Sequence, residues 1–497
     1  MSGTRPLSYL ERYQLSRINV GVPATVCFTA LLRVSADPAH QHLDNVLAQA
    51  VQVLLKRYPI LGCKIAGVRT TSPKWTTPDS PLEASQVIGN AHDDFPPSAR
   101  TDTSSVISAA FDVLSRVEPE KGPLWRVWAF KDDEEEEIPT WRIVYATNHS
   151  LADGTGARNL FADLLKILHT PDTPTPNENE KQNEIAPAME SHFDLSSSYL
   201  DMVRLIYSEF LLPRLPSFLR PAHSTPFHRK PLVPPYQQKT AIRTLTLPAS
   251  LVAELKTASK ARGVATLHPV LYIAGLAAVE AHKFPSDSVV VGSTPASVRA
   301  LEASLPYATG NYVYEIHVPH HLDNSAESHS FWSTCASYAQ KLVDPQTRIT
   351  GLKGIGSLSL VPDGPLPSSS SATSPSTKYD AWMMERSRKE EPFETTFEVS
   401  NLGVLPLSGW EDSKGLKELV WAQTAMTGTI FAINPIAIRG GDLAFTLTYR
   451  AGTVEESLVD RIWTSYERIL RDIAAGQVPA GSDICAAGGD DNAVSIS

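Results

Sequence analysis

Apolar residues recur along the chain at two spacings, which predict strands and helices in alternation. Residues 24–34 (ATVCFTALLRV) form an apolar, β-branched run that is typical of a buried strand. Residues 43–58 repeat apolar positions at helical spacing, and Pro59 ends this predicted helix. The run ILGCKIAGV (60–68) predicts a further strand.

A helix and a hairpin are predicted next. Residues 102–115 favour a helix, and the apolar runs GPLWRVWAF (122–130) and TWRIVYATNH (140–149) favour two strands joined as a hairpin. The acidic run from Asp132 to Glu137 lies at the tip of this hairpin, where we expect a solvated loop.

The middle of the chain changes in composition, which predicts a domain boundary. Residues 171–192 are rich in Pro, Thr, Asn and Glu and are interpreted as a surface linker. Residues 193–220 carry apolar pairs at helical spacing until Pro213 and Pro216. This segment fits either a crossover helix packed on a domain face or an interfacial helix that touches a membrane or covers an apolar substrate entrance.

The second half repeats the alternation of strands and helices, with a low-complexity loop at 364–377. Its predicted strands are 241–248, 289–297, 395–403, 429–440 and 442–450, and its predicted helices are 251–261, 268–284 and 457–476. The chain has 497 residues, more than one core usually serves, so the prediction is an α/β protein of two domains. We place them at 1–170 and 241–497, with a linker and crossover helix at 171–240.

Charge and cysteine usage narrow the function classes. The formal net charge is -10, and no run of Lys or Arg is present, which disfavours nucleic-acid binding. The four cysteines lack metal-ligand spacing, so we expect reduced thiols and no metal site. The N-terminal residues lack an apolar signal region and no run of about 18 apolar residues follows, so a cytoplasmic protein without a transmembrane span is predicted.

The chemically most informative segment is 141–165, which predicts a strand, a tight turn and a helix. His149 lies at the strand end, Gly154 and Gly156 lie in the turn, and Asp153 occupies the helix N-cap position. A histidine at such a junction can face a cleft with one ring nitrogen, as a general base requires. The alternative interpretation is a loop histidine next to an ordinary helix cap.

The sequence HSLADG, from His149 to Gly154, resembles the HxxxDG motif of the CoA-dependent acyltransferase superfamily, which includes chloramphenicol acetyltransferase, plant BAHD enzymes and condensation domains. The Trp-Arg pair of the preceding strand, Asn148, the N-terminal LERYQLSR and the later SNLG are most similar to the fungal alcohol O-acetyltransferase family. The DFGWG block of the plant enzymes is absent.

This resemblance implies two chloramphenicol-acetyltransferase-like domains, each a mixed sheet flanked by helices, with a tunnel between them. It implies acetyl-CoA as a co-substrate, a small-molecule alcohol as acceptor and no permanently bound cofactor. By the same resemblance, His149 deprotonates the acceptor for direct transfer without an acyl-enzyme, and Asp153 shapes the loop by pairing with an arginine. Arg299 and Arg17 are the two candidates, and Arg299 is favoured because it follows a buried strand.

Two further blocks are candidates for the tunnel. Asn311 lies in GNYVYEI (310–316), which resembles a turn near the acceptor channel of relatives or is an ordinary turn before a strand. Ser400 and Asn401 lie in SNLG at a predicted strand end, and either can donate a hydrogen bond to an oxyanion.

Other functions remain open at this stage. N-acetylation of a long-chain amine would need the same base, and a condensation-type enzyme would use a carrier-protein thioester in place of CoA. An inactive homologue that binds ligands is the non-enzymatic alternative. Residues 193–220 allow peripheral contact with the endoplasmic reticulum or a lipid droplet. Hydrolase, dehydrogenase and P-loop motifs are absent from the sequence.

Overall fold

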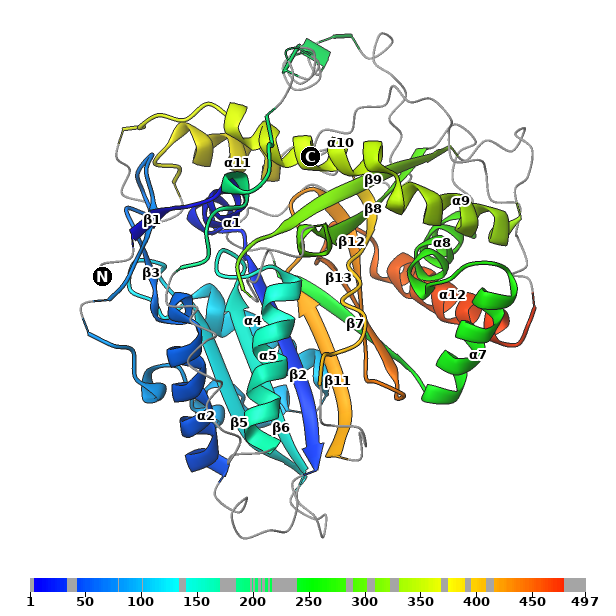
Figure 1. Ribbon diagram of the computed structural model, residues 1–497, viewed down its shortest axis with the longest axis horizontal. Coiled ribbons are helices and arrows are strands. Elements are labelled where there is room, and N and C mark those ends of the chain that lie inside the picture. Colours follow the sequence, from blue (N-terminus) through cyan, green and yellow to red (C-terminus); the bar gives the residue numbers. More distant parts are fainter. Residues whose placement is uncertain are drawn as a thin grey trace.

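The computed structural model is an α/β protein built on two main sheets (Figure 1). It describes residues 4–33, 43–78, 80–100, 102–133, 140–169, 185–196, 239–282, 289–301, 309–321, 330–367, 374–388, 395–407 and 415–477, with a few isolated residues between 199 and 216. Most of the expected helix at 193–220 and most of the acidic run lie outside the described residues, and residues 193–196 are described without helix. Asp132 lies in β5, and its Oδ1 is 2.7 Å from Arg142 Nε.

The first sheet has four strands, and each pair of neighbours is antiparallel. Helices cover both of its faces, with α2 (Leu43–Arg57) and α5 (Gly154–His169) on one side and α4 (Thr103–Ser115) on the other. The strand order is β11 (Leu416–Gln423), β2 (Thr25–Arg33), β6 (Thr140–Asn148) and β5 (Trp125–Asp133). Phe28, Phe161 and Trp421 pack together in its core and join β2, α5 and β11.

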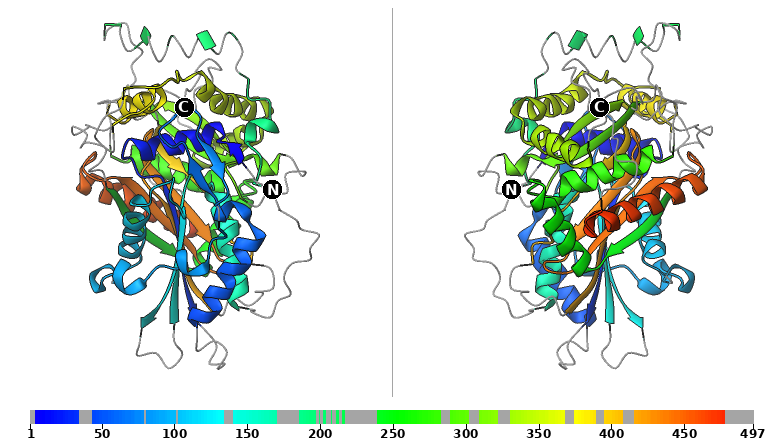
Figure 2. Two further views of the ribbon diagram at one scale, coloured as in Figure 1. Left: turned by 90° about the vertical axis from the view of Figure 1, so that its left-hand side faces the viewer. Right: turned by 90° about the vertical axis from the view of Figure 1, so that its right-hand side faces the viewer.

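The second sheet is mixed and has six strands. Their order is β7 (Thr240–Leu247), β13 (Leu443–Arg450), β12 (Thr429–Ala437), β10 (Thr395–Val399), β8 (Val289–Ser297) and β9 (Val313–His321). The helices around it are α7 (Ala249–Ala261), α8 (Leu267–Glu280), α9 (Phe331–Val343), α10 (Pro345–Ser357) and α12 (Glu456–Ala474). Figure 2 shows α12 and α7 along the side of this sheet that faces away from the first sheet. The very apolar α8 is buried almost all round, between this sheet and α12.

A small sheet of β1 (Thr4–Pro6), β4 (Lys74–Thr76) and β3 (Lys64–Ala66) lies on the side of the molecule that carries the first sheet (Figure 1). The strand predicted for 60–68 is therefore mostly wrong, because Pro59–Gly62 forms a 3-10 turn and only three residues pair. Pro59 lacks an N–H and has a fixed φ, which suits the first turn of such a helix.

The first helix ties the N-terminal segment to the second half of the chain. Helix α1 (Tyr9–Asn19) begins at a capping box formed by Ser8 and Glu11, and it packs against α11 (Lys378–Arg388). Ser16 and Asn19 both donate hydrogen bonds to Asp380 Oδ1, at 2.9 and 3.2 Å. A stretch that carried no helix prediction thus forms part of the contact between the halves.

Strand β11 also joins the halves. It follows β10 in the sequence, yet it pairs with β2 from Leu416↔Leu32 to Gln423↔Val26, with one irregularity near its start. Its sequence, LKELVWAQ, carried no strand prediction. The second half thus supplies the edge strand of the first sheet.

Candidate active site

The turn between β6 and α5 carries His149 and is held by main-chain hydrogen bonds. The His149 N–H donates to the Ala24 carbonyl at 2.8 Å, which continues the pairing of β6 with the segment before β2. The Ser150 N–H donates to Asn148 Oδ1 at 2.8 Å, which turns the chain away from the sheet. The strand end and the turn therefore fix where the imidazole emerges.

Asp153 closes this turn by accepting hydrogen bonds from two separate parts of the chain. Its Oδ1 accepts from the Gly156 N–H at 2.7 Å, the N-cap contact of α5. Its Oδ2 accepts from the Tyr312 N–H at 2.7 Å and from Arg299 Nη1 at 2.8 Å. The structure thus brings Arg299 to Asp153, whereas the side chain of Arg17 bonds to other groups.

The glycines of the motif are needed because atoms of other residues lie very close to their Cα positions. A Cβ on Gly156 would lie 3.2 Å from the Gly310 carbonyl oxygen and 3.3 Å from Arg299 Nη2. A Cβ on Gly154 would lie 3.1 Å from Leu402 Cδ2. Both contacts are with the second half of the chain, so small residues at the start of α5 let the two halves meet.

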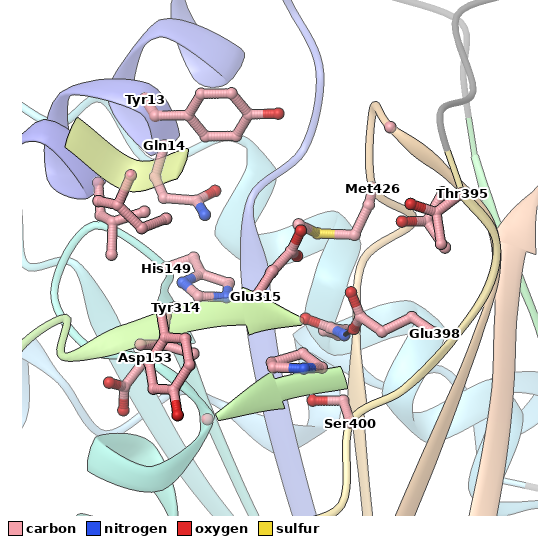
Figure 3. A pocket seen from close by; sticks show the side chains of 18 of the residues that line it. Tyr13, Gln14, His149, Asp153, Tyr314, Glu315, Thr395, Glu398, Ser400 and Met426 are labelled. Atoms are coloured by element: carbon pink, nitrogen blue, oxygen red, sulfur yellow. Dashed lines mark hydrogen bonds between the residues drawn. The ribbon is translucent and has the colours of Figure 1, made fainter. Parts of the chain in front are cut away.

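His149 and Asp153 line a cavity of about 110 Å³ whose wall is built by both halves (Figure 3). The N-terminal contribution comes from α1 and the turn before α5. The rest comes from strands of the second sheet, from the end of β11 and from the segments beside them. In Figure 3 the Gln14 amide lies next to the His149 ring, while the Asp153 carboxylate points to the side. The cavity therefore offers a histidine and polar side chains within a concave, partly apolar wall, as small-molecule sites commonly do.

The charge state of His149 is set by burial and by Arg17. The residue is only 7% exposed, and its Nδ1 is closed off from solvent, which leaves Nε2 as the nitrogen that faces the cavity. Burial lowers the pKa of His149, and the positive charge of Arg17 lowers it further. The neutral imidazole that a general base requires is thus favoured at neutral pH.

Arg17 is a fully buried cation, and within the described part of the chain its guanidinium donates to neutral acceptors. Its Nη1 donates to Gln14 Oε1 at 2.8 Å and its Nη2 donates to the Ala425 carbonyl at 3.0 Å. Desolvation lowers the pKa of Arg17 to about 10. Because Gln14 Oε1 faces Arg17, the Gln14 Nε2 donor is directed into the cavity beside His149, as Figure 3 shows.

The remaining sequence candidates differ in their placement. Ser400 lines the cavity. Asn401 does not, because its Oδ1 accepts from the Gly403 N–H at 2.8 Å in a local turn. Asn311 Nδ2 donates to the Ser150 carbonyl at 2.9 Å, so it supports the loop that carries His149.

Sequence similarity assigns the chain to a family. A sequence profile of the alcohol acetyltransferase family matches residues 80–470. The chain belongs to this family. The alcohol acetyltransferase profile thus covers His149, Asp153 and Arg299 as well as β10, although no curated protein sequence matches the chain significantly.

Solved structures show the same fold at low identity. TRI3 trichothecene 15-O-acetyltransferase from Fusarium sporotrichioides is 15% identical, with a TM-score of 0.63 over 95% of each chain. The EpoB NRPS cyclization-docking bidomain from Sorangium cellulosum is 14% identical, with a TM-score of 0.58 over 95% of this chain and 85% of that one. Polyketide synthase associated protein 5 from Mycobacterium tuberculosis is 11% identical, with a TM-score of 0.54 over 95% of this chain and 100% of that one.

This alcohol acetyltransferase family member is thus an α/β protein of the two-domain acyltransferase and condensation-domain type. Within the described ranges, no helix is long and apolar enough to span a membrane. The same ranges contain no group of three side chains suited to hold a metal ion. The family implies an acyl-CoA co-substrate and an acceptor.

The sequence did not identify several of the residues that line the cavity. Gln14 lies inside LERYQLSR, where helical spacing alone does not show which face meets a cavity. Glu398 lies in a predicted strand, and Glu315 lies in GNYVYEI (310–316), which was interpreted as a turn before a strand. The available signal for both was an acidic residue within an otherwise apolar or neutral run.

Proposed function

We propose that this protein transfers an acetyl or short acyl group from acetyl-CoA to the hydroxyl of a small-molecule alcohol, with His149 as the general base. The observation that carries the proposal is the placement of His149, whose buried ring faces a cavity walled by both halves of the chain. Membership of the alcohol acetyltransferase family supports a hydroxyl acceptor.

In the proposed reaction His149 Nε2 removes the proton from the acceptor hydroxyl. The oxygen then attacks the thioester carbonyl carbon, and the carbonyl electron pair moves to the oxygen to form a tetrahedral oxyanion. The C–S bond breaks as this oxyanion collapses, and the departing CoA thiolate takes the proton from the imidazolium. The products are the ester and free CoA, and no acyl-enzyme forms.

The surrounding residues have distinct proposed roles. Gln14 Nε2 and Ser400 Oγ are two hydrogen-bond donors of the cavity wall, and we assign them to the oxyanion. Asp153 holds the loop through Arg299 and exchanges no proton, because its carboxylate is already engaged by the Gly156 and Tyr312 N–H groups. Asn311 supports the same loop through Ser150.

The test follows free CoA with a thiol reagent while purified protein is incubated with acetyl-CoA and a panel of alcohols, and mass spectrometry identifies the ester. We expect alcohol-dependent CoA release that His149→Ala lowers by about 10²- to 10⁴-fold. His92→Ala is the matched control, because His92 has 92% of its side chain exposed. Wild-type turnover in His149→Ala would refute the assignment.

The direct transfer is tested separately. Protein incubated with labelled acetyl-CoA and no acceptor should carry no covalent label in its intact mass spectrum. A stoichiometric acetyl adduct that the addition of alcohol discharges would establish an acyl-enzyme and contradict the proposal.

A further inference from the structure

The cavity contains a second pair of titratable groups, on two strands of the second sheet, that the proposed reaction does not use. Glu315 lies on β9 and Glu398 on β10, with β8 between them, and both side chains line the cavity (Figure 3). Glu398 is 1% exposed, so its carboxyl is almost completely removed from solvent except for the cavity that it faces.

Two side chains are hydrogen-bonded to the carboxyl group of Glu398. Its Oε1 accepts from Gln423 Nε2 at 2.7 Å. The second partner is the carboxyl group of Glu315, while the buried Glu398 Oε2 accepts from no N–H or hydroxyl group of the described residues. Two carboxyl groups can hydrogen-bond to one another only when one of them carries a hydrogen, so this contact requires a proton on one member of the pair.

The two carboxyl groups are close enough to influence one another and differ in their surroundings. Glu315 Oε2 lies 2.9 Å from His317 Nε2, and the charge of Arg386 also acts on it, so the pKa of Glu315 is lowered. Burial and the neighbouring Glu315 raise the pKa of Glu398. The pair therefore holds one proton at neutral pH, with Glu398 as a donor and Glu315 as an acceptor.

A donor next to an acceptor matches the hydrogen-bonding capacity of a hydroxyl group, which does both. A protonated amine would require Glu398 to ionise next to the charged Glu315, which is unfavourable in a buried site. An anionic ligand would be repelled by the charge of Glu315. The arrangement thus favours a neutral ligand oxygen that carries its own hydrogen.

We propose that Glu398 and Glu315 form a recognition subsite for a second hydroxyl group of the acceptor, distinct from the hydroxyl that His149 deprotonates. The subsite rests on the proposed function, and it makes the preferred acceptor an uncharged molecule with at least two hydroxyls. Glu398 donates to the oxygen of the second hydroxyl, whose hydrogen is donated to Glu315. Neither glutamate takes part in bond making or breaking.

The test compares α,ω-diols with the mono-alcohols of the same carbon number, from butane to decane, with acetyl-CoA as the donor. A diol has two equivalent hydroxyls, so a ratio of about two in kcat/KM is expected without a subsite. With the subsite, kcat/KM of the wild type for the diol should exceed that for the mono-alcohol by more than about tenfold. This is expected at the chain length that spans the distance from His149 to the glutamate pair, because hydrogen bonds to charged groups are strong.

Variants of the pair complete the test. Glu398→Ala and Glu315→Ala should each return the ratio to about two, whereas Glu398→Gln, which keeps an N–H donor, should retain part of it. Glu385→Ala is the matched control, because Glu385 is exposed on α11 and lies outside the cavity lining. The ratio is taken within one variant, so it is independent of the fraction of active protein.

A binding measurement on a variant outside the pair gives a test that does not depend on whether Glu398→Ala and Glu315→Ala fold. In His149→Ala, infrared difference spectra should show a shift of the protonated-carboxyl stretch when the preferred diol is added, but not with the mono-alcohol. A ratio of two at every chain length, or no infrared shift with any diol, would overturn the subsite alone. Wild-type protein that releases no CoA with any alcohol would instead contradict the proposed function.

Discussion

Asp153 and Arg299 lie 146 residues apart in the chain and form a buried ion pair, with Arg299 Nη1 2.8 Å from Asp153 Oδ2. The pair joins the loop that carries His149 to the 3-10 turn after β8. Arg299 Nη2 also donates to the Gly310 carbonyl at 3.0 Å, so the same guanidinium fixes a second loop of the second half. The position of the His149 loop thus depends on both halves.

Asp153→Asn should destabilise the protein and lower its activity together. The substitution leaves Arg299 buried without a counter-charge, and breaking a buried pair costs about 3–5 kcal/mol in the free energy of unfolding. Chemical denaturation measures the change, and Asp460→Asn serves as control, because its pair with Arg243 is exposed and should contribute about 0–1 kcal/mol. Unchanged stability with lost activity would make Asp153 a direct participant in catalysis.

Arg17→Met should shift the acid limb of the pH profile of kcat/KM, the range in which the rate falls at low pH, to higher pH. His149 acts as a base only when neutral, and its pKa is lowered by burial and by Arg17, so wild-type kcat/KM should fall only below about pH 6.5. Removing the positive charge makes protonation of His149 easier and raises its pKa, whereas Arg17→Lys keeps the charge and should leave the limb nearly in place. An acid limb at the same pH in wild type and in Arg17→Met would exclude this electrostatic effect of Arg17 on His149.

Ser400→Ala should lower kcat by about 10- to 100-fold, with a smaller change in KM, if its hydroxyl stabilises the oxyanion. Asn401→Ala is the paired variant, because Asn401 closes a turn to Gly403 outside the cavity lining and should affect mainly the free energy of unfolding. Steady-state kinetics with saturating acetyl-CoA separate the two. A larger loss of kcat in Asn401→Ala would reverse their roles.

Gly310→Ala should reduce both the stability and the activity of the protein. Gly310 has a φ of +90°, which disfavours residues with a Cβ, and the added carbon would lie 2.8 Å from the Tyr312 ring. We expect a loss of about 1–3 kcal/mol by thermal or chemical unfolding and a fall in kcat, because the Gly310 carbonyl accepts from the Asp153 N–H. Gly263→Ala offers a control, with a similar positive φ and no atom within 4 Å of the new Cβ.

Local sequence patterns predicted the strand-turn-helix around His149, because its alternation, its glycines and its N-cap residue all act within a few residues of one another. Arg299 was favoured as the partner of Asp153 on the argument that an arginine after a buried strand needs a counter-charge, and the structure places the two in contact. These features depend on short-range geometry or on one simple electrostatic requirement.

The cavity wall opposite His149 could not be predicted in the same way. Whether Glu398 is a cavity residue depends on the neighbours of β10, and these are β8 and β12, which lie far from each other in the sequence. The same limit applies to Gln14, whose role depends on Arg17 and on contacts of α1 with the second half. Periodicity describes which face of an element is apolar, but it does not identify the partner of that face.

The pairing of β11 with β2 has a consequence for synthesis of the chain on the ribosome. Strand β2 is apolar and buried along most of its length, yet one of its two neighbours consists of residues 416–423. The nascent first half therefore presents an open sheet edge until residues 416–423 have been translated, and such edges pair readily with other chains. A fragment that stops near residue 240 should aggregate when it is expressed alone, and co-expression of the missing half should rescue its solubility.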